Sequence, residues 1–246
     1  MDDAEDERND HVRQDSDTLE NETLSGFEES TAAGQYDNDV LRLRKALSNE
    51  KFSPTIMQYD AELVDRMSVS IEMEEEALSK APPSTDPVAT LSNDLHWTSL
   101  NRAKYLMRAY LRTRLWKIEQ HVMHILMPEN GLYERLSPAE RTYAEKYTGI
   151  MDDHLQSTAL SRMPPRFSSL VQQMSPEDEL AADAQERVFD MIPEPNLDTF
   201  VFCRPLEDIG NFEVDGDAYE LTAMKTYMMR YRIVQRLIEN KQMELL

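Results

Sequence analysis

A single long stretch, Ser99 to Met127, has one apolar side and one basic side in a chain that is otherwise strongly acidic. Its apolar residues recur at steps of three and four, the spacing of one side of an α-helix: Ala103, Met107, Tyr110, Leu111, Leu115, Ile118, Val122, Ile125 and Leu126. Basic residues repeat on another side: Lys104, Arg108 and Arg112, with Arg114 and Lys117 nearby. This pattern predicts a long helix that packs against other protein, and it does not indicate an active site.

Acidic residues concentrate at the start of the sequence. The 246-residue chain has a formal net charge of −21, and residues 1–39 contain 14 acids and 2 bases. Such a segment has too little apolar surface to offset the entropy of ordering, so we expect residues 1–39 to form an acidic disordered tail. Net negative charge also disfavours nucleic acid as the main ligand. The basic side of the long helix is therefore expected to be solvated or to pair with acids of a neighbour.

Cysteine content and apolar runs bound the class of protein. Cys203 is the single cysteine, which excludes an internal disulfide and a multi-cysteine metal site. No apolar run approaches the ~20 residues of a membrane span, and the acidic N-terminus lacks the apolar segment of a secretory signal. Because no Lys/Arg cluster resembles a nuclear import signal, we expect that a nuclear protein of this kind would enter with a partner.

The first half of the sequence predicts helices. Short amphipathic spacing covers Val40–Leu47, a second helix runs from Pro54 to about Ser79, and the basic helix starts near Leu91 after a proline-rich loop. Ser137-Pro138-Ala139-Glu140 has the pattern of a capping box that opens a helix ending near Ser161. We interpret residues 40–165 as a helical A domain and residues 166–195 as a linker that can hold one helix.

The periodicity changes after Pro195. Leu197–Leu206 is rich in β-formers, Asp215-Gly216 suits a tight hairpin turn, and Tyr227, Met229 and Tyr231 alternate. A helix over 232–240 and a last strand over 243–246 complete the pattern. The fold class predicted is mainly α, a helical bundle A domain followed by a small β-rich B domain over 196–246.

Sequence patterns for catalysis are missing. The 6 glycines are not grouped into a phosphate loop, and neither G-x-S-x-G nor H-E-x-x-H occurs. His121 and His124, with Glu119 or His154, could in principle hold zinc, but partly exposed polar residues at a helix end are the favoured interpretation. The acids at 72, 74, 75 and 76 are expected to form a solvated helix end. We therefore predict no catalytic residue, no cofactor and no metal.

Five strings carry a resemblance to a known family. In chain order they are Asn49–Pro54, Tyr110–Glu119, Leu136–Glu140, Met163–Pro165 and Pro195–Phe202. In this order and spacing they resemble the Sld-five subunit family of the GINS complex, a eukaryotic replication factor, over about residues 40–246. The second and fifth strings are the specific ones. The acidic tail and the stretch from Phe167 to Ile192 are longer than is usual in that family.

The resemblance implies a function as well as a fold. It implies a helical A domain before a small β-rich B domain, in a heterotetramer of four related subunits without catalysis of their own. In that family the tetramer joins the MCM helicase hexamer and a Cdc-type cofactor to make the active replicative helicase, which implies a nuclear location and at most indirect DNA contact. In some relatives the N-terminal region docks onto a trimeric replisome hub.

Two sets of residues are predicted to make the contacts of such a scaffold. The partner interface is expected on the long helix: Met107, Tyr110, Leu111, Arg112, Arg114, Leu115 and Ile118, with Arg112 and Arg114 meeting partner or intrachain acids. Leu197, Phe200 and Phe202 are expected in the B-domain core or in an interdomain contact. The alternative function is an acidic binding protein or chaperone that acts through its N-terminal tail.

Overall fold

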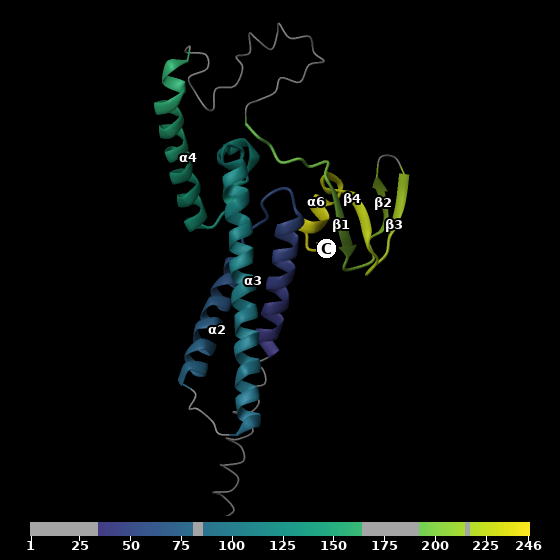
Figure 1. Cartoon of the computed structure of the whole chain (residues 1–246). Helices are drawn as coiled ribbons and strands as arrows, with labels where there is room; N and C mark the ends of the chain where they lie inside the picture. The colour runs from purple at the N-terminus through teal and green to yellow at the C-terminus, as the bar shows by residue number, and fades with distance from the viewer. Residues whose placement is uncertain (1–33, 81–85, 164–191, 215–216) are drawn as a thin grey trace, which may run out of the picture. The chain divides into compact units, whose positions relative to one another are not determined.

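The structure, a computed structural model of the chain, describes residues 34–80, 86–163, 192–214 and 217–246. A helix covers residues 34–52. It is followed by α2 (Ala61–Lys80), α3 (Pro87–Leu126), η1 (Pro128–Asn130), η2 (Tyr133–Arg135), α4 (Pro138–Thr158) and η3 (Leu160–Arg162) (Figure 1). The C-terminal elements are β1 (Phe200–Pro205), β2 (Gly210–Val214), β3 (Asp217–Leu221), β4 (Tyr227–Arg230), α6 (Tyr231–Glu239) and β5 (Met243–Leu245). The predicted fold class, mainly α with a small β-rich C-terminal part, is confirmed.

The chain divides into two compact units that do not follow the order of the sequence. One holds the described residues up to Arg42 together with Asp65–Leu100, and the other holds Leu43–Val64 together with Asn101–Leu246. The A-domain and B-domain boundaries expected from the sequence stay predictions. Most of the predicted tail and most of the predicted linker lie outside the described residues.

The first helix begins earlier than Val40, where the sequence pattern placed its start. Within the first unit, Asp39 is buried and receives a two-pronged contact from Arg66, whose Nε and Nη2 donate to the two carboxylate oxygens at 3.1 and 3.0 Å. Gln35 Nε2 donates to the same carboxylate at 3.2 Å. These bonds explain why residues before Val40 are already helical.

The second helix begins later than predicted, at Ala61 rather than Pro54. Residues 53–60 are not helical, and the backbone carbonyls of Thr55 and Met57 accept hydrogen bonds from basic side chains of α3. Asp60 then serves as the helix cap, because its Oδ1 accepts from the backbone N–H of Leu63 at 3.2 Å. A proline at the start of an apolar pattern could not distinguish these two starting points.

Helix α3 is the longest described element, with 40 residues, and it begins at Pro87, four residues before the predicted start. The carboxylate of Asp86 accepts from the backbone N–H of Val88 at 3.1 Å, and Pro87 lacks the N–H that a first helical turn leaves unpaired. The helix has a kink at His121, where φ is −129° and ψ is 30°. It ends at Leu126, close to the predicted end.

The capping box that opens α4 is confirmed. Ser137 Oγ accepts from the backbone N–H of Glu140 at 3.2 Å, and the Ser137 N–H donates to Glu140 Oε2 at 2.8 Å. Pro138 occupies the first turn, so two of the orphan N–H groups at the helix start are paired and a third is absent. This start is rigid, which matters because Glu140 also belongs to a buried ion cluster.

A three-stranded antiparallel sheet of order β4-β1-β5 forms the centre of the C-terminal part. Phe200 pairs with Arg230 and Cys203 with Leu245, while β2 and β3 form a separate hairpin in which Val214 pairs with Asp217. This pairing leaves two residues between the strands, as the Asp215-Gly216 pattern predicted; the turn itself lies outside the described residues. Tyr231, which the sequence placed in a strand, starts α6 instead.

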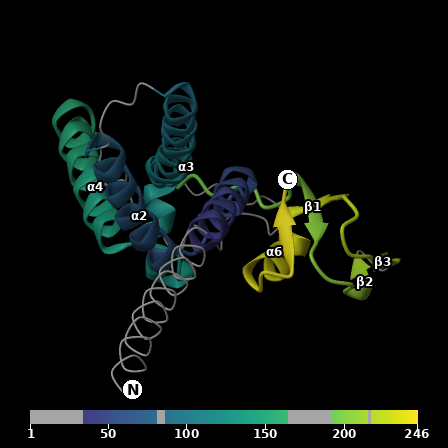
Figure 2. The ribbon, with the colours of Figure 1, turned by 90° about the horizontal axis from the view of Figure 1, so that it is seen from below.

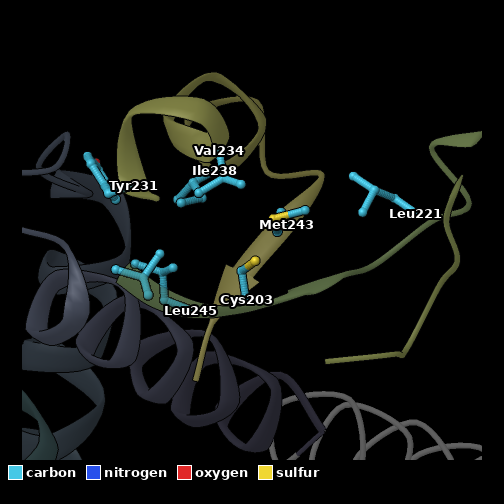
Figure 3. Close-up of a cluster of buried hydrophobic side chains, with 8 residues drawn as sticks. Cys203, Leu221, Tyr231, Val234, Ile238, Met243 and Leu245 are labelled. Atoms are coloured by element: carbon cyan, nitrogen blue, oxygen red, sulfur yellow. The ribbon is translucent and has the colours of Figure 1, made fainter. Parts of the chain in front are cut away.

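An apolar core fills the space between the sheet and α6, which lie side by side (Figure 2). Its buried members come from β1, β3, α6 and β5: Val201, Cys203, Leu221, Tyr231, Val234, Ile238, Met243 and Leu245 (Figure 3). The burial of β1 alternates, as a half-buried strand requires, with Val201 and Cys203 inward. Because Val201 and Cys203 point into the core, Phe200 and Phe202 point to the opposite face of the sheet.

Polar contacts join this C-terminal part to residues 43–60 within the second unit. The Tyr231 hydroxyl lies 2.9 Å from Ser53 Oγ and 3.1 Å from Thr55 Oγ1, all three buried. The backbone of Leu245 bonds on both sides, accepting from Ser48 Oγ at 2.9 Å and donating to Asn49 Oδ1 at 2.8 Å.

Among the described residues, no helix has the length and apolarity that crossing a bilayer requires.

Removing the cap hydroxyl in Ser137→Ala should destabilise the chain by about 1 kcal/mol, because the Glu140 N–H loses its acceptor at a buried helix start. The measurement is the free energy of unfolding in urea. Thr142→Ala removes an exposed hydroxyl from the same helix, one that only bonds back to the Pro138 carbonyl, and should change stability by under ~0.5 kcal/mol. Equal effects of the two variants would contradict the role assigned to the cap.

Glu244 makes a pH-dependent contribution to the stability of the fold. Burial alone would raise its pKa, but Arg204, which donates from Nε at 2.8 Å, and Lys45, at 3.4 Å, hold the pKa below its ordinary value of 4.5. A carboxylate with a depressed folded-state pKa stabilises the fold above its unfolded pKa, and this contribution is lost as pH falls. The stability difference between the natural chain and Glu244→Gln, about 1 kcal/mol at pH 7, should therefore shrink below pH 4.5.

Urea unfolding measured from pH 7 to pH 3 tests this. Glu207→Gln, an exposed acid in the loop after β1, is the matched control and should run parallel to the natural chain. A Glu244→Gln difference that stays constant over the whole range would show that the carboxylate charge contributes nothing.

Candidate functional site

The side of α3 predicted as a partner interface is mostly buried within the chain itself. Four of the seven predicted residues are buried, two are half-buried and one is exposed; in that order they are Met107, Tyr110, Arg114 and Ile118, then Leu111 and Leu115, then Arg112. The buried four pack within the chain itself. Partner contact stays a prediction for all seven.

Arg114 is the centre of a fully buried ion cluster, with 0% of its surface exposed. Its Nε and Nη2 donate to the two carboxylate oxygens of Glu140 at 2.7 and 3.0 Å, and Nη1 donates to Glu50 Oε2 at 3.0 Å. The remaining two N–H groups donate to the backbone carbonyls of Met57 at 2.7 Å and Arg135 at 3.0 Å. All five guanidinium donors are thus used, the condition under which a buried arginine is tolerated.

Lys117 shares the same acid one turn further along α3. Its Nζ donates to Glu50 Oε1 at 2.8 Å and to the Thr55 carbonyl at 2.8 Å. Glu50 therefore accepts a hydrogen bond from one basic side chain on each carboxylate oxygen. The cluster links the helix over 34–52, the segment 53–60, α3 and the start of α4.

The electrostatics follow from burial and from these partners. Burial lowers the pKa of Arg114, but the hydrogen bonds it donates to Glu140 and the charge of Glu50 outweigh this effect, so the net pKa lies above its ordinary value. Burial lowers the pKa of Lys117 more than Glu50 raises it, so its net pKa falls. Burial also raises the pKa of Tyr110, whose ring centroid lies 5.7 Å from the Arg114 guanidinium, to about 12. These groups hold the helical part of the second unit together.

The opposite side of α3 is exposed and carries aromatic and basic residues. Tyr105 is 68% exposed and Trp116 is 59% exposed, and Arg108 and Arg112 lie between them in the sequence, also exposed. The predicted basic side of the helix is therefore present at Arg108 and Arg112, whereas Arg114 and Lys117 belong to the interior. Trp116 was not selected by the sequence analysis, because a lone aromatic outside the apolar spacing gives no periodic signal.

The outer face of the C-terminal sheet is a second exposed surface. Phe200 and Phe202 on β1 are 59% and 56% exposed, and Met228, which pairs with Phe202 across β4, is 60% exposed. Arg230 lies over the Phe200 ring at 5.8 Å. Neither phenylalanine belongs to the core; Leu197 is partly buried against it. The sequence analysis expected both phenylalanines in the B-domain core or in an interdomain contact. They lie outside this core because Val201 and Cys203 occupy the inward positions of β1, and an interdomain contact stays a prediction.

The residues considered for zinc or for nucleophilic chemistry have other contacts. His121 Nδ1 lies 3.0 Å from the Pro193 carbonyl, and His124 Nδ1 lies 3.9 Å from the Glu194 carboxylate. No group of three or more His, Cys, Asp or Glu within the described residues is placed to hold a metal ion. Burial raises the pKa of the Cys203 thiol to about 11, so it stays protonated and unreactive at neutral pH.

Arg114→Lys tests the buried cluster, because lysine keeps the charge and loses the two-pronged fork. We expect the free energy of unfolding to fall by about 3 kcal/mol, since Glu140 and two carbonyls lose partners in a buried site. Arg112→Lys, two residues earlier and exposed, is the matched control and should change stability by under ~0.5 kcal/mol. Urea unfolding of both variants measures the difference, and a mild Arg114→Lys would contradict the burial described above.

Comparison with known proteins identifies the family to which the chain is similar. A family model described as the GINS complex protein helical bundle domain matches residues 68–159, and one described as the DNA replication complex GINS protein SLD5 C-terminus matches residues 195–246. The protein named DNA replication complex GINS protein SLD5 in Arabidopsis thaliana is 35% identical over 214 residues, which cover 85% of this chain and 91% of that protein.

Two less similar relatives, from other organisms, have the same name. The Dictyostelium discoideum protein is 29% identical over 209 residues, covering 83% of this chain and 90% of that protein. The Homo sapiens protein is 28% identical over 218 residues, covering 84% and 88%. With the helical fold, the C-terminal sheet and the matched strings in place, the chain belongs to the SLD5 family of GINS proteins, the Sld-five family that its sequence resembles.

Proposed function

We infer that this chain is a non-catalytic scaffold subunit of a heterotetrameric GINS complex that acts in DNA replication. The complex joins the MCM hexamer and its Cdc-type cofactor to form the active replicative helicase in the nucleus. The chain contributes surfaces rather than reacting groups, and its sister subunits cover those surfaces. The names of the relatives support membership of such a complex.

The observation that carries this proposal is the exposed apolar face of the C-terminal sheet, made by Phe200, Phe202 and Met228. Soluble monomers rarely expose several large apolar side chains on one regular surface, and such surfaces usually mark protein interfaces. Burying one phenylalanine is worth roughly 1.5–3 kcal/mol. A partner that covered this face could therefore gain several kcal/mol from these side chains alone.

The helices of the first unit add a further exposed apolar set. Two of its members lie on α2 and three on the early turns of α3: Val69, Met73, Val88, Leu91 and Leu95, each more than half exposed. A chain with separate apolar surfaces on its helices and on its sheet is suited to contact more than one neighbour. This favours a multi-subunit assembly over a single binary complex.

The test is co-expression with the three candidate sister subunits, followed by purification through a tag on one of them. Phe200→Ser combined with Phe202→Ser should weaken incorporation more than about tenfold, because two large contacts are lost and both positions are exposed in the free chain. Circular dichroism and the urea midpoint of the variant chain should stay unchanged.

Met224→Ser is the matched control. It removes an apolar side chain of similar exposure from the turn before β4, at a residue that is not itself part of a strand. Stoichiometric recovery of all four subunits with the double phenylalanine variant would remove the support that this face gives to the proposal. A substitution at Tyr110 would be a weaker test, because that side chain is buried and its loss would disturb the fold itself.

A further inference from the structure

A basic hollow lies between the end of the helix over 34–52 and the exposed side of α3, within the second unit. Its lining contains four cationic side chains, Lys51, Lys104, Arg108 and Arg112, and no acid. The other lining residues are Leu47, Asn101, Tyr105, Ala109 and Thr113. The whole chain has 47 acids and 26 bases, so a surface whose charged residues are all basic has the opposite charge to the chain as a whole. The buried ion cluster uses Arg114 and Lys117 but none of these four.

The two arginines of this basic hollow are not neutralised by the described part of the fold. Arg108 and Arg112 make no side-chain ion pair with any of the described residues, and Lys51 Nζ lies over the Phe52 ring at 5.4 Å. Like charges gathered in one hollow repel one another, so an anion that enters it is stabilised by several cations at once. Tyr105, at 68% exposed, and Leu47 add apolar area to the same lining. The ligand that fits is therefore an acidic peptide with some apolar side chains.

We propose that residues 15–29 of the chain's own acidic tail occupy the basic hollow. This segment carries six acids and neither Lys nor Arg, and three large apolar residues lie among the acids: Leu19, Leu24 and Phe27. Residues 2–10 also carry six acids, but they include Arg8 and no large apolar residue. The segment 15–29 therefore matches both the charge and the apolar part of the lining, and residues 2–10 match the charge alone.

The connecting chain is long enough for this contact. The 33 residues before the described structure span at most about 110 Å when fully extended, whereas the 40 residues of α3 span about 60 Å. Tail and hollow belong to one polypeptide, so their encounter is intramolecular and has the advantage of a high effective concentration. An external polyanion such as a phosphate backbone would instead have to approach against the charge of the tail. Occupancy by the tail would shield the basic hollow from other anions.

Zero-length carbodiimide coupling tests the proposal on the full-length chain at 0.05 M salt. The reagent joins a carboxylate to a lysine amine only when the two are in contact, and the tail has carboxylates but no lysine. We expect mass spectrometry to find Lys51 and Lys104 linked to residues 15–29. Lys146 and Lys225, both exposed and outside the hollow, should give no enrichment. The links should fall sharply at 1 M salt, where the screening length is about 3 Å.

Two pairs of charge variants sharpen the test. Arg108→Glu with Arg112→Glu leaves both hollow lysines in place and should lower the tail links about fivefold, whereas Lys146→Glu with Arg162→Glu makes the same charge change elsewhere and should not. Neutralising Asp15, Asp17, Glu20 and Glu22 to their amides should lower the links as well. Neutralising Asp2, Asp3, Glu5 and Asp6 removes an equal number of charges and should leave the links between the hollow lysines and residues 15–29 unchanged.

Several results would overturn the proposal. Tail links spread evenly over Lys146, Lys225 and the hollow lysines would mean that the tail has no preferred site. In a mixture of isotope-labelled and unlabelled chain, links found only between copies would assign the hollow to a second molecule. Tight binding of a labelled single-stranded oligonucleotide, with the tail unlinked, would assign it to a phosphate backbone. None of these results depends on assembly with sister subunits, so they leave the proposed function untouched.

Discussion

Five hydrogen bonds from one buried guanidinium organise the helical part of the second unit. Arg114 binds Glu140 through a two-pronged contact, Glu50 through one oxygen, and two backbone carbonyls through its last donors. The desolvation of a buried charge is offset only when each donor has a partner. The site therefore requires the helix over 34–52, the segment 53–60, the loop before α4 and the α4 start to sit in one arrangement.

This constraint explains how the chain presents its surfaces. Arg114 and Lys117 are used inside the fold, whereas Lys104, Arg108 and Arg112 of the same helix line the basic hollow. The segment 53–60 contributes carbonyls to the ion cluster and, through Ser53 and Thr55, also contacts the Tyr231 hydroxyl of the C-terminal part. One short non-helical segment thus connects the ion cluster to the part that carries Phe200 and Phe202. The ion cluster and the exposed phenylalanines are therefore held in place by contacts to the same segment.

The sequence predicted the elements whose signals are local. The capping box at Ser137, the hairpin after Val214 and the β-strand within Leu197–Leu206 all depend on neighbouring residues, and the structure has each of them. The burial of Arg114 and Lys117 depends instead on Glu50, more than 60 residues earlier, and an arginine at helical spacing looks the same whether it is solvated or paired inside. The run of β-formers likewise predicted a strand without saying that α6 would cover the side opposite Phe200.

The most direct test of the ion cluster is a double-mutant cycle in urea unfolding with Arg114→Met, Glu140→Gln and the two combined. Each single change leaves a buried group without its partner, while the combined change removes both halves of the contact. The account predicts that the double variant loses at least about 1.5 kcal/mol less than the sum of the single variants. Single effects that add within about 0.5 kcal/mol would show that the two side chains are independent, and would contradict the central role given to this contact.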